Sequence, residues 1–127
     1  MAHRARIVIV EEVRGSQGTP AARAALREAI ARHLTRRGFH VLDGGKTVVF
    51  RLQPTLLLMD VQNGTSVEVK ASLVAVDRRG KVAAMVEGGA RAKGVAPATA
   101  AALESQALEA AARSLAEDLA PRLMEVR

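Results

Sequence analysis

The chain of 127 residues has no cysteine, tryptophan or tyrosine. The lack of cysteine excludes disulfides and thiolate chemistry and leaves the cellular compartment open. Phe39 and Phe50 are the only aromatic residues, so the core has to close through tight approach of alanine, valine and leucine side chains. No apolar run approaches the roughly 20 residues that a bilayer-spanning helix needs. The composition predicts one domain, residues 1–127, without a transmembrane segment.

The start of the chain does not have the pattern of a signal peptide. The apolar run Ile7 to Val10 is too short for a signal-peptide core and leads directly into Glu11 and Glu12. Two locations stay open. Either an export signal has been removed ahead of this chain and the protein is periplasmic or outer-membrane associated, or the protein is cytoplasmic.

Positive charge is concentrated in the first part of the chain. The net charge is +6; residues 1–46 hold nine basic and four acidic residues (+5), whereas residues 99–127 hold three and five (−2). Such a basic segment is typical either of phosphate or acidic-partner binding or of a solvated face. The lack of tyrosine and tryptophan argues against single-strand and RNA recognition, which uses aromatic stacking.

Apolar periodicity predicts a strand at residues 7–10 and then a helix. Thr19 suits the N-cap, Pro20 the first helical position, and Gly38 the helix end, with Phe39 as a hydrophobic clamp after it. Positions spaced by three and four form one apolar stripe on this helix: Ala22, Leu26, Ala29, Ile30, His33 and Leu34.

The middle of the chain predicts five more strands, separated by glycine-containing turns. Pro54 is expected to separate the second and third of them, and Gly88–Gly89 to bend or bulge the last. The predicted strands are 39–42, 47–52, 55–62, 66–77 and 81–93, with turns at Asp43–Gly45, Asn63–Gly64 and Arg78–Gly80. Alternation predicts which side chains share a face of the last three strands: Leu57, Met59 and Val61; Val67, Val69, Ala71, Leu73 and Ala75; and Val82, Ala84, Val86 and Gly88.

A final helix is predicted to begin near Pro97 or Thr99 and to run past Leu119, with Pro121 ending or kinking it. Its apolar stripe is Leu108, Ala112, Leu115, Leu119 and Leu123. We therefore predict an α+β fold, in the order β-α-β-β-β-β-β-α, with two helices on one face of a mixed, largely antiparallel sheet. The first β-α-β unit is the expected parallel element.

No group of residues predicts an active or metal site. Residues 44–47 (Gly-Gly-Lys-Thr) end like a phosphate loop, but His40 stands where that loop needs a glycine and strand-like residues follow, which favours a hairpin turn. His3, His33 and His40 lack metal-ligand spacing. Asp60 alternates onto the polar face of its strand, facing solvent, Lys70 or Arg51. We expect no catalytic, cofactor or metal residues and no enzymatic activity.

Two surfaces are candidates for partner binding. One is the Arg-rich first helix; the other is the hairpin of strands 66–77 and 81–93, whose long edges are able to pair with another chain unless charge blocks them. Arg91 and Lys93 either block such pairing or mark the contact. The candidate partner-binding residues are Arg23, Arg27, Arg36, Arg37, Arg78, Arg79, Arg91 and Lys93.

Four segments of the sequence also resemble a group of bacterial envelope domains. Residues 25–34, followed by Gly38-Phe39-His40-Val41, are similar to the helix and "G-[FY]-x-V" entry of the curli-secretion-channel family, the penicillin-binding-protein-activator lipoproteins and the N-terminal domain of the Tol-Pal propeller protein. Residues 67–77 resemble the long central strand of these domains, and residues 107–116 their closing helix. The resemblance implies a non-catalytic, lipoprotein-like envelope module that docks onto other proteins or assembles with copies of itself.

Two functions follow as hypotheses. The first is a protein-interaction or assembly module of a bacterial envelope complex, whose partners are envelope components or other copies of the chain. The alternative is a cytoplasmic protein that binds nucleic acid or an acidic partner through the first helix. Salt separates them, because phosphate binding weakens steeply with ionic strength and strand pairing does not.

Overall fold

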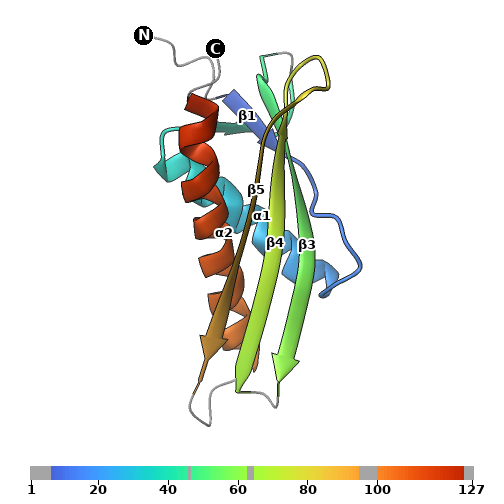
Figure 1. The fold of residues 1–127 in the computed structure, drawn as a ribbon, viewed down its shortest axis with the longest axis vertical. Helices are drawn as coiled ribbons and strands as arrows, with labels where there is room; N and C mark the ends of the chain where they lie inside the picture. Colours follow the sequence, from blue (N-terminus) through green and yellow to red (C-terminus); the bar gives the residue numbers. More distant parts are fainter. Residues whose placement is uncertain (1–6, 46, 63–64, 95–99, 125–127) are drawn as a thin grey trace.

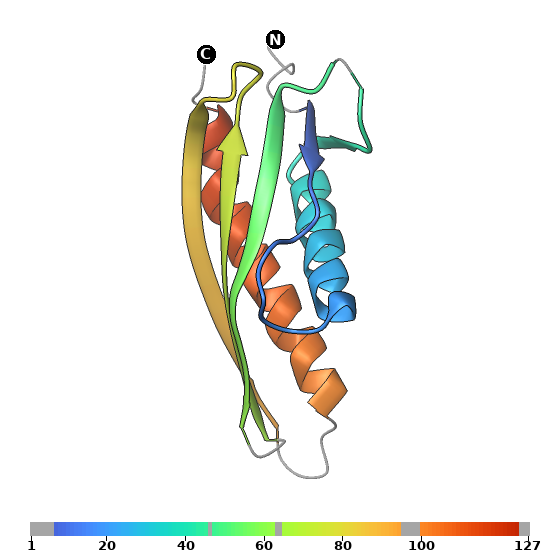
Figure 2. The same cartoon turned by 90° about the vertical axis from the view of Figure 1, so that its right-hand side faces the viewer.

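The computed structural model describes residues 7–45, 47–62, 65–94 and 100–124. Its elements are β1 (Ile7–Val10), α1 (Pro20–Arg36), β2 (His40–Leu42), β3 (Phe50–Gln62), β4 (Ser66–Val76), β5 (Val82–Lys93) and α2 (Ala100–Met124). The strands form one sheet in the order β2-β1-β3-β4-β5, and both helices cover the same face (Figures 1 and 2). The predicted fold class is confirmed, with one strand fewer than expected.

The missing strand results from Pro54, which does not interrupt β3. The Pro54 carbonyl accepts the N–H of Arg14 at 3.0 Å. The backbone nitrogen and the carbonyl of a strand residue point to the same neighbouring strand, so the nitrogen of Pro54 also points toward Arg14. The lack of an N–H on this proline therefore removes no hydrogen bond between β3 and β4. β3 therefore runs unbroken past Pro54, with β1 beside its first part and the segment around Arg14 beside its middle.

The parallel part of the sheet lies around β1. Both β2 and β3 pair with β1 in parallel, so the predicted parallel β-α-β unit is confirmed. The turn predicted at Asp43–Gly45 is not a hairpin, because β1 lies between β2 and β3 in the sheet. Lys46 lies outside the described residues, as do His3, Asn63–Gly64, Pro97 and Thr99.

β4 shows the predicted alternation. Its five helix-facing side chains are completely buried: Val67, Val69, Ala71, Leu73 and Ala75. β3 and β5 flank it in antiparallel register, and each pairing contains one irregularity, between Leu56 and Leu58 on β3 and between Ala75 and Val76 on β4.

Two side-chain placements were wrong because of these irregularities, since one extra residue moves the following side chains to the other face. Leu57 was expected to share a face with Met59 and Val61, but it is the extra residue of β3 and is 45% exposed. Val82 was expected to lie beside Ala84, but it is 59% exposed and pairs with Val76 on the face that the helices leave open.

The two glycines of β5 do not produce a bulge, since the register with β4 continues through them. A Cβ atom on Gly88 would lie 3.0 Å from Ser114 of α2, and one on Gly89 would lie 2.7 Å from the carbonyl oxygen of Val69. The glycines thus serve close approach of the helix and the neighbouring strand, which is the other common use of glycine in a strand.

α1 begins and ends as predicted. The Thr19 hydroxyl accepts the N–H of Ala22, and Pro20 is the first helical residue. At the other end Gly38 has φ +91°, its N–H bonds to Thr35, and the N–H of Phe39 bonds to Leu34, which is the Schellman arrangement. Phe39 is buried in the core.

α2 lies along β4 and β5 and against α1 (Figure 1). Its predicted stripe is buried throughout, from Leu108 to Leu123. The helix does not end at Pro121 but continues to Met124. Neither helix, in the part of the chain that is described, combines the length and apolar character that crossing a bilayer requires.

Candidate interaction surfaces

The arginines in the first half of α1 hold the loop between β1 and α1. Arg23 donates from one guanidinium nitrogen to the carbonyls of Gln17 and Gly18, both at 2.9 Å. Arg27 donates from Nε to the carbonyl of Val10 at 2.8 Å. Both side chains are half-buried, so these hydrogen bonds tie the strand end and the loop to the helix. Some of the N–H donors of Arg23 and Arg27 are therefore already engaged within the protein.

Two arginines, one in the second half of α1 and one at its C-cap, pair with acidic residues of α2. Arg32 forms an ion pair with one carboxylate oxygen of Glu109 at 2.5 Å, and Arg37 pairs with Glu117 at 3.3 Å. His33, which was predicted as part of the apolar stripe, is 8% exposed, and its Nε2 lies 3.0 Å from the other oxygen of Glu109. The basic first helix and the acidic last helix are thus neighbours whose charges meet. Arg36 is exposed and has no partner among the described residues.

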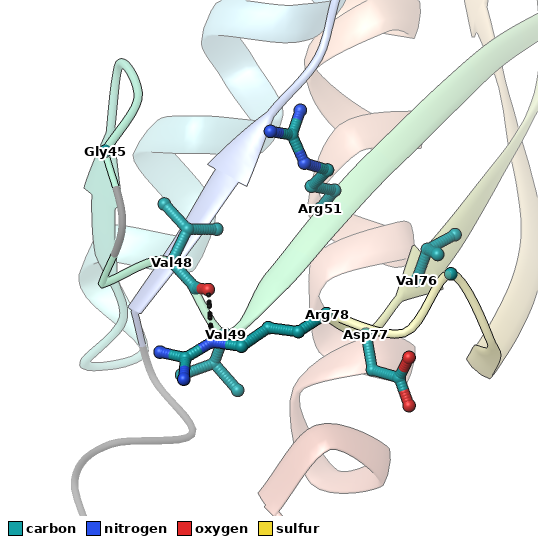
Figure 3. A pocket seen from close by; sticks show the side chains of 8 residues that line it. Gly45, Val48, Val49, Arg51, Val76, Asp77 and Arg78 are labelled. Carbon is teal, nitrogen blue, oxygen red and sulfur yellow. Dashed lines mark hydrogen bonds between the residues drawn. The ribbon is translucent and has the colours of Figure 1, made fainter.

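A pocket of about 330 Å³ lies where the start of β3 meets the turn between β4 and β5 (Figure 3). Its lining is mixed, with Val48, Val49 and Val76 beside Arg51, Asp77 and Arg78. Arg78 donates from Nε to the carbonyl of Val48 at 3.0 Å, and Arg51 is 3.4 Å from Glu11. In Figure 3 the two guanidiniums and the Asp77 carboxylate point in different directions. The groups do not converge on a point where a reacting atom would sit.

Asp77 organises the turn that carries Arg78 and Arg79. Its Oδ1 accepts the N–H groups of Arg79 and Lys81, both at 2.9 Å. The hydrogen bond from Lys81, together with that from Arg79 and the charges of both side chains, holds the pKa of the Asp77 carboxyl below its ordinary value. Arg78 and Arg79 are therefore held on a defined turn and are both exposed.

Asp60 lies on the face predicted for it, but its neighbours differ from those expected. It pairs in register with Glu68 and accepts a hydrogen bond from Gln62 at 3.0 Å, while Arg51 is with Glu11. In the described part of the chain, no three side chains of histidine, aspartate or glutamate are grouped as metal ligands would be. His33 and His40 lie on different elements, α1 and β2.

The outer edge of β5, unlike most arginines of α1, has backbone groups without a partner among the described residues. β5 is the last strand of the sheet, and no described segment pairs with its outer side; in Figure 2 it forms the left margin of the molecule. The N–H of Gly94 bonds to the carbonyl of Thr65, which places the hydrogen-bonded pairs between β4 and β5 at even positions of β5. The odd positions therefore direct their N–H and C=O groups to the open edge: Met85, Glu87, Gly89, Arg91 and Lys93.

The side chains of these odd positions lie on the face of the sheet that the helices leave open. Arg91 pairs with Glu68 of β4 at 3.2 Å, and Lys93 is exposed. Met85 is 60% exposed and lies beside Val74. The candidates Arg91 and Lys93 are thus brought together on the edge strand, away from the arginines of α1.

Glu87 and Met85 were not among the predicted partner-binding residues. The candidates were chosen by positive charge, which selects neither an acidic nor an apolar residue. Strand alternation is the signal that could have found them, because it puts Met85, Glu87 and Arg91 on one face. That this face lies at a sheet edge follows only from the strand order.

Comparison with known proteins shows the fold of this chain. No family model and no curated protein matches the sequence. Among solved structures, protein XCC0632 from Xanthomonas campestris, described with the family model DUF330, has a TM-score of 0.66 at 12% identity over 94% of this chain and 86% of its own. The PelC dodecamer from Paraburkholderia phytofirmans has a TM-score of 0.63 at 15% identity, over 88% of this chain and 89% of its own.

A minor lipoprotein from Acinetobacter baumannii has a TM-score of 0.51 at 14% identity, over 94% of this chain and 90% of its own. At such identities these structures share the fold with this chain. None of the three names refers to the curli, penicillin-binding-protein-activator or Tol-Pal groups, so the finer resemblance stays a prediction.

Proposed function

We propose that this protein is a non-enzymatic assembly module of a bacterial envelope complex, periplasmic or outer-membrane associated, which binds other copies of itself. The observation that carries the proposal is the long open edge of β5 in a fold shared with PelC, a protein that forms a dodecamer. The fold likeness to a minor lipoprotein supports the envelope setting. The pocket beside Arg51 supports no reaction, because its polar groups do not converge.

The alternative, binding of nucleic acid through α1, receives less support from the side-chain contacts. Arg23 and Arg27 are engaged with backbone carbonyls, and Arg32 and Arg37 with carboxylates of α2. The internal hydrogen bonds fix the orientation of Arg23 and Arg27, and the carboxylates of α2 offset the charges of Arg32 and Arg37, so phosphate binding gains less from these side chains.

Light scattering coupled to size-exclusion chromatography tests the proposal, at low and high salt, with and without duplex DNA. We expect a defined oligomer whose mass changes little with salt or DNA, because strand pairing depends on backbone hydrogen bonds. A monomer that shifts onto DNA only at low salt would overturn the proposal in favour of the basic helix. Fractionation of cells that express the full gene product tests the location, and recovery in the cytoplasm would contradict it.

A further inference from the structure

The edge of β5 is long and regular enough to pair with another strand. Between Met85 and Lys93 its register with β4 is unbroken, and the segment contains no proline. Natural proteins usually protect an edge of this length by shortening, bulging or charging it, and of these devices this segment has only charges, one acidic and two basic. The other edge strand, β2, has only three residues, so β5 offers the longer row of unpaired backbone groups.

Two of the three charges on β5 are arranged symmetrically about Gly89. Glu87 lies two residues before it and Arg91 two residues after it, on the same face of the sheet. In an antiparallel pair of two identical strands centred on Gly89, Glu87 of each copy lies opposite Arg91 of the other. Two opposite-charge pairs then form across the contact, and such cross-strand pairs stabilise a sheet.

From this symmetry we propose that β5 pairs with β5 of a second copy, antiparallel and about a two-fold axis at Gly89. The inference rests on the proposed self-association and specifies its contact. Met85, Glu87, Gly89, Arg91 and Lys93 direct their N–H and C=O groups outward, and this register places outward-facing residues opposite one another, as an antiparallel ladder requires. Two five-stranded sheets become one continuous sheet.

Neighbouring registers fit less well. A shift that centres the pair on Gly88 places Glu87 opposite Gly89 and Met85 opposite Arg91. A shift to Ala90 places Glu87 opposite Lys93 but leaves Arg91 opposite Gly89. Only the register centred on Gly89 gives both Glu87 and Arg91 of each copy an oppositely charged partner, and it places Met85 opposite the long side chain of Lys93. Arg91 has enough guanidinium donors to serve Glu68 of its own chain and Glu87 of the other copy.

The side chains on the helix-facing side of β5 are also compatible with this register. Gly88 lies opposite Ala90, and Val86 opposite Ala92, so the inward side chains at the contact are small or apolar. A two-fold contact of this kind is isologous and produces dimers, which are units from which larger even-numbered assemblies can be built.

Two charge reversals test the register. A homodimer of the Glu87→Arg variant would place two arginines opposite each other at both charge pairs, and a homodimer of the Arg91→Glu variant would place two glutamates there. We expect each variant alone to show a dimer dissociation constant raised by about tenfold, because attractive cross-strand pairs become repulsive. Mixing the two variants gives a heterodimer with an opposite-charge pair at both positions. At one position the unchanged Arg91 of one copy faces the unchanged Glu87 of the other. At the other position the two substituted residues, an arginine at 87 and a glutamate at 91, face each other.

The mixture should therefore dimerise with nearly the wild-type constant. Analytical ultracentrifugation measures each variant alone and the mixture, and thermal unfolding confirms that each variant folds. Glu28→Arg on α1 and Arg113→Glu on α2 are the matched controls, since they make the same charge changes on exposed side chains away from β5. We expect both controls to dimerise as the wild type does.

The outcomes separate this inference from the proposed function. If the wild type associates but the single variants associate equally well, or the mixture gains nothing, the register is wrong while self-association stands. If the wild type stays monomeric, both proposals fail and the edge is left for a strand of another protein.

A second measurement does not depend on charge. The chain has no cysteine, so Met85→Cys and Lys93→Cys each introduce one thiol. In the proposed register residues 85 and 93 of different copies are directly opposite, whereas residues 85 of the two copies are about 27 Å apart, at about 3.4 Å per residue. A short thiol-to-thiol crosslinker should join the mixture of the two variants and neither variant alone. Crosslinking of either variant with itself would overturn the register.

Discussion

The α1 helix and the β5 edge strand are two charged surfaces of this protein, and they differ in what their polar groups already contact. Four arginines of α1 and its C-cap already have partners: Arg23 and Arg27 bond to carbonyls of the preceding loop and strand end, and Arg32 and Arg37 pair with carboxylates of α2. The edge of β5 has backbone groups without partners among the described residues. A residue's charge does not decide whether it is available to a partner, because neighbouring elements decide which donors and acceptors are already in use.

The comparison predicts that α1 changes stability and β5 changes association. The largest stability effect is expected from Leu34→Ala, because the Leu34 side chain on α1 is completely buried in the core. The loss of side-chain contacts and the cavity that remains should lower the free energy of unfolding by about 2–5 kcal/mol. Urea denaturation measures it. Met85→Ala on β5, where the side chain is 60% exposed, is the control and should change the value by less than about 0.5 kcal/mol.

Arg27→Ala should have the next largest effect. It removes the hydrogen bond to the Val10 carbonyl and leaves that acceptor without its charged partner, at a cost of about 1.5–3 kcal/mol. Arg36→Ala is the matched control on the same helix, because Arg36 is exposed and has no described partner. Urea denaturation of both variants checks the difference. If the Arg27→Ala and Arg36→Ala variants were equally stable, Arg27 would have no structural role and would be a candidate for partner binding again.

Glu109→Gln should have a smaller effect that depends on salt. It weakens the contacts of α2 with Arg32 and His33, and partly exposed ion pairs contribute up to about 1 kcal/mol. We expect the difference in free energy of unfolding from wild type to shrink at high ionic strength, because salt screens exposed pairs. Urea denaturation at low and high salt measures it. A difference that does not change with salt would indicate that the contact acts through packing.

The smallest effect is expected from Asp77→Asn and appears only in the pH dependence. The folded pKa of Asp77 is below its ordinary value, so its carboxylate stabilises the fold above the unfolded pKa, and that contribution is lost as the pH falls through the folded pKa. Wild type should therefore lose its advantage over Asp77→Asn on acidification from neutral pH to about pH 2. Urea denaturation across this range tests it, and a constant difference would contradict the assignment.

Most of the local structure could be predicted from short-range patterns. The stripe from Leu26 to Leu34, the glycine end of α1 at Gly38 and the alternation of β4 were all confirmed, because each depends on residues within a few positions of one another. The fold class followed from the order of these elements. The expected break at Pro54 and the expected bulge at Gly88 and Gly89 were wrong, since the effect of these residues depends on which segment lies beside them.

The candidate surface was predicted only in part. Arg91 and Lys93 were named as edge residues, and the structure places both on an edge strand. The remaining candidates were grouped by charge, and the structure separates them into α1, the turn after β4 and β5. Glu87 was passed over, because its position opposite a second copy becomes meaningful only when β5 is known to be the last strand.

The sequence by itself determined where the helices and most strands run and which side chains face the core. Helical and strand periodicity arises from backbone geometry within a few residues, and burial of apolar side chains selects the face. Tertiary structure alone decided the strand order, the unbroken course of β3 past Pro54 and the pairing of α1 arginines with α2 glutamates. These depend on contacts between residues far apart in the chain, and local periodicity contains no information about which distant segment becomes the neighbour.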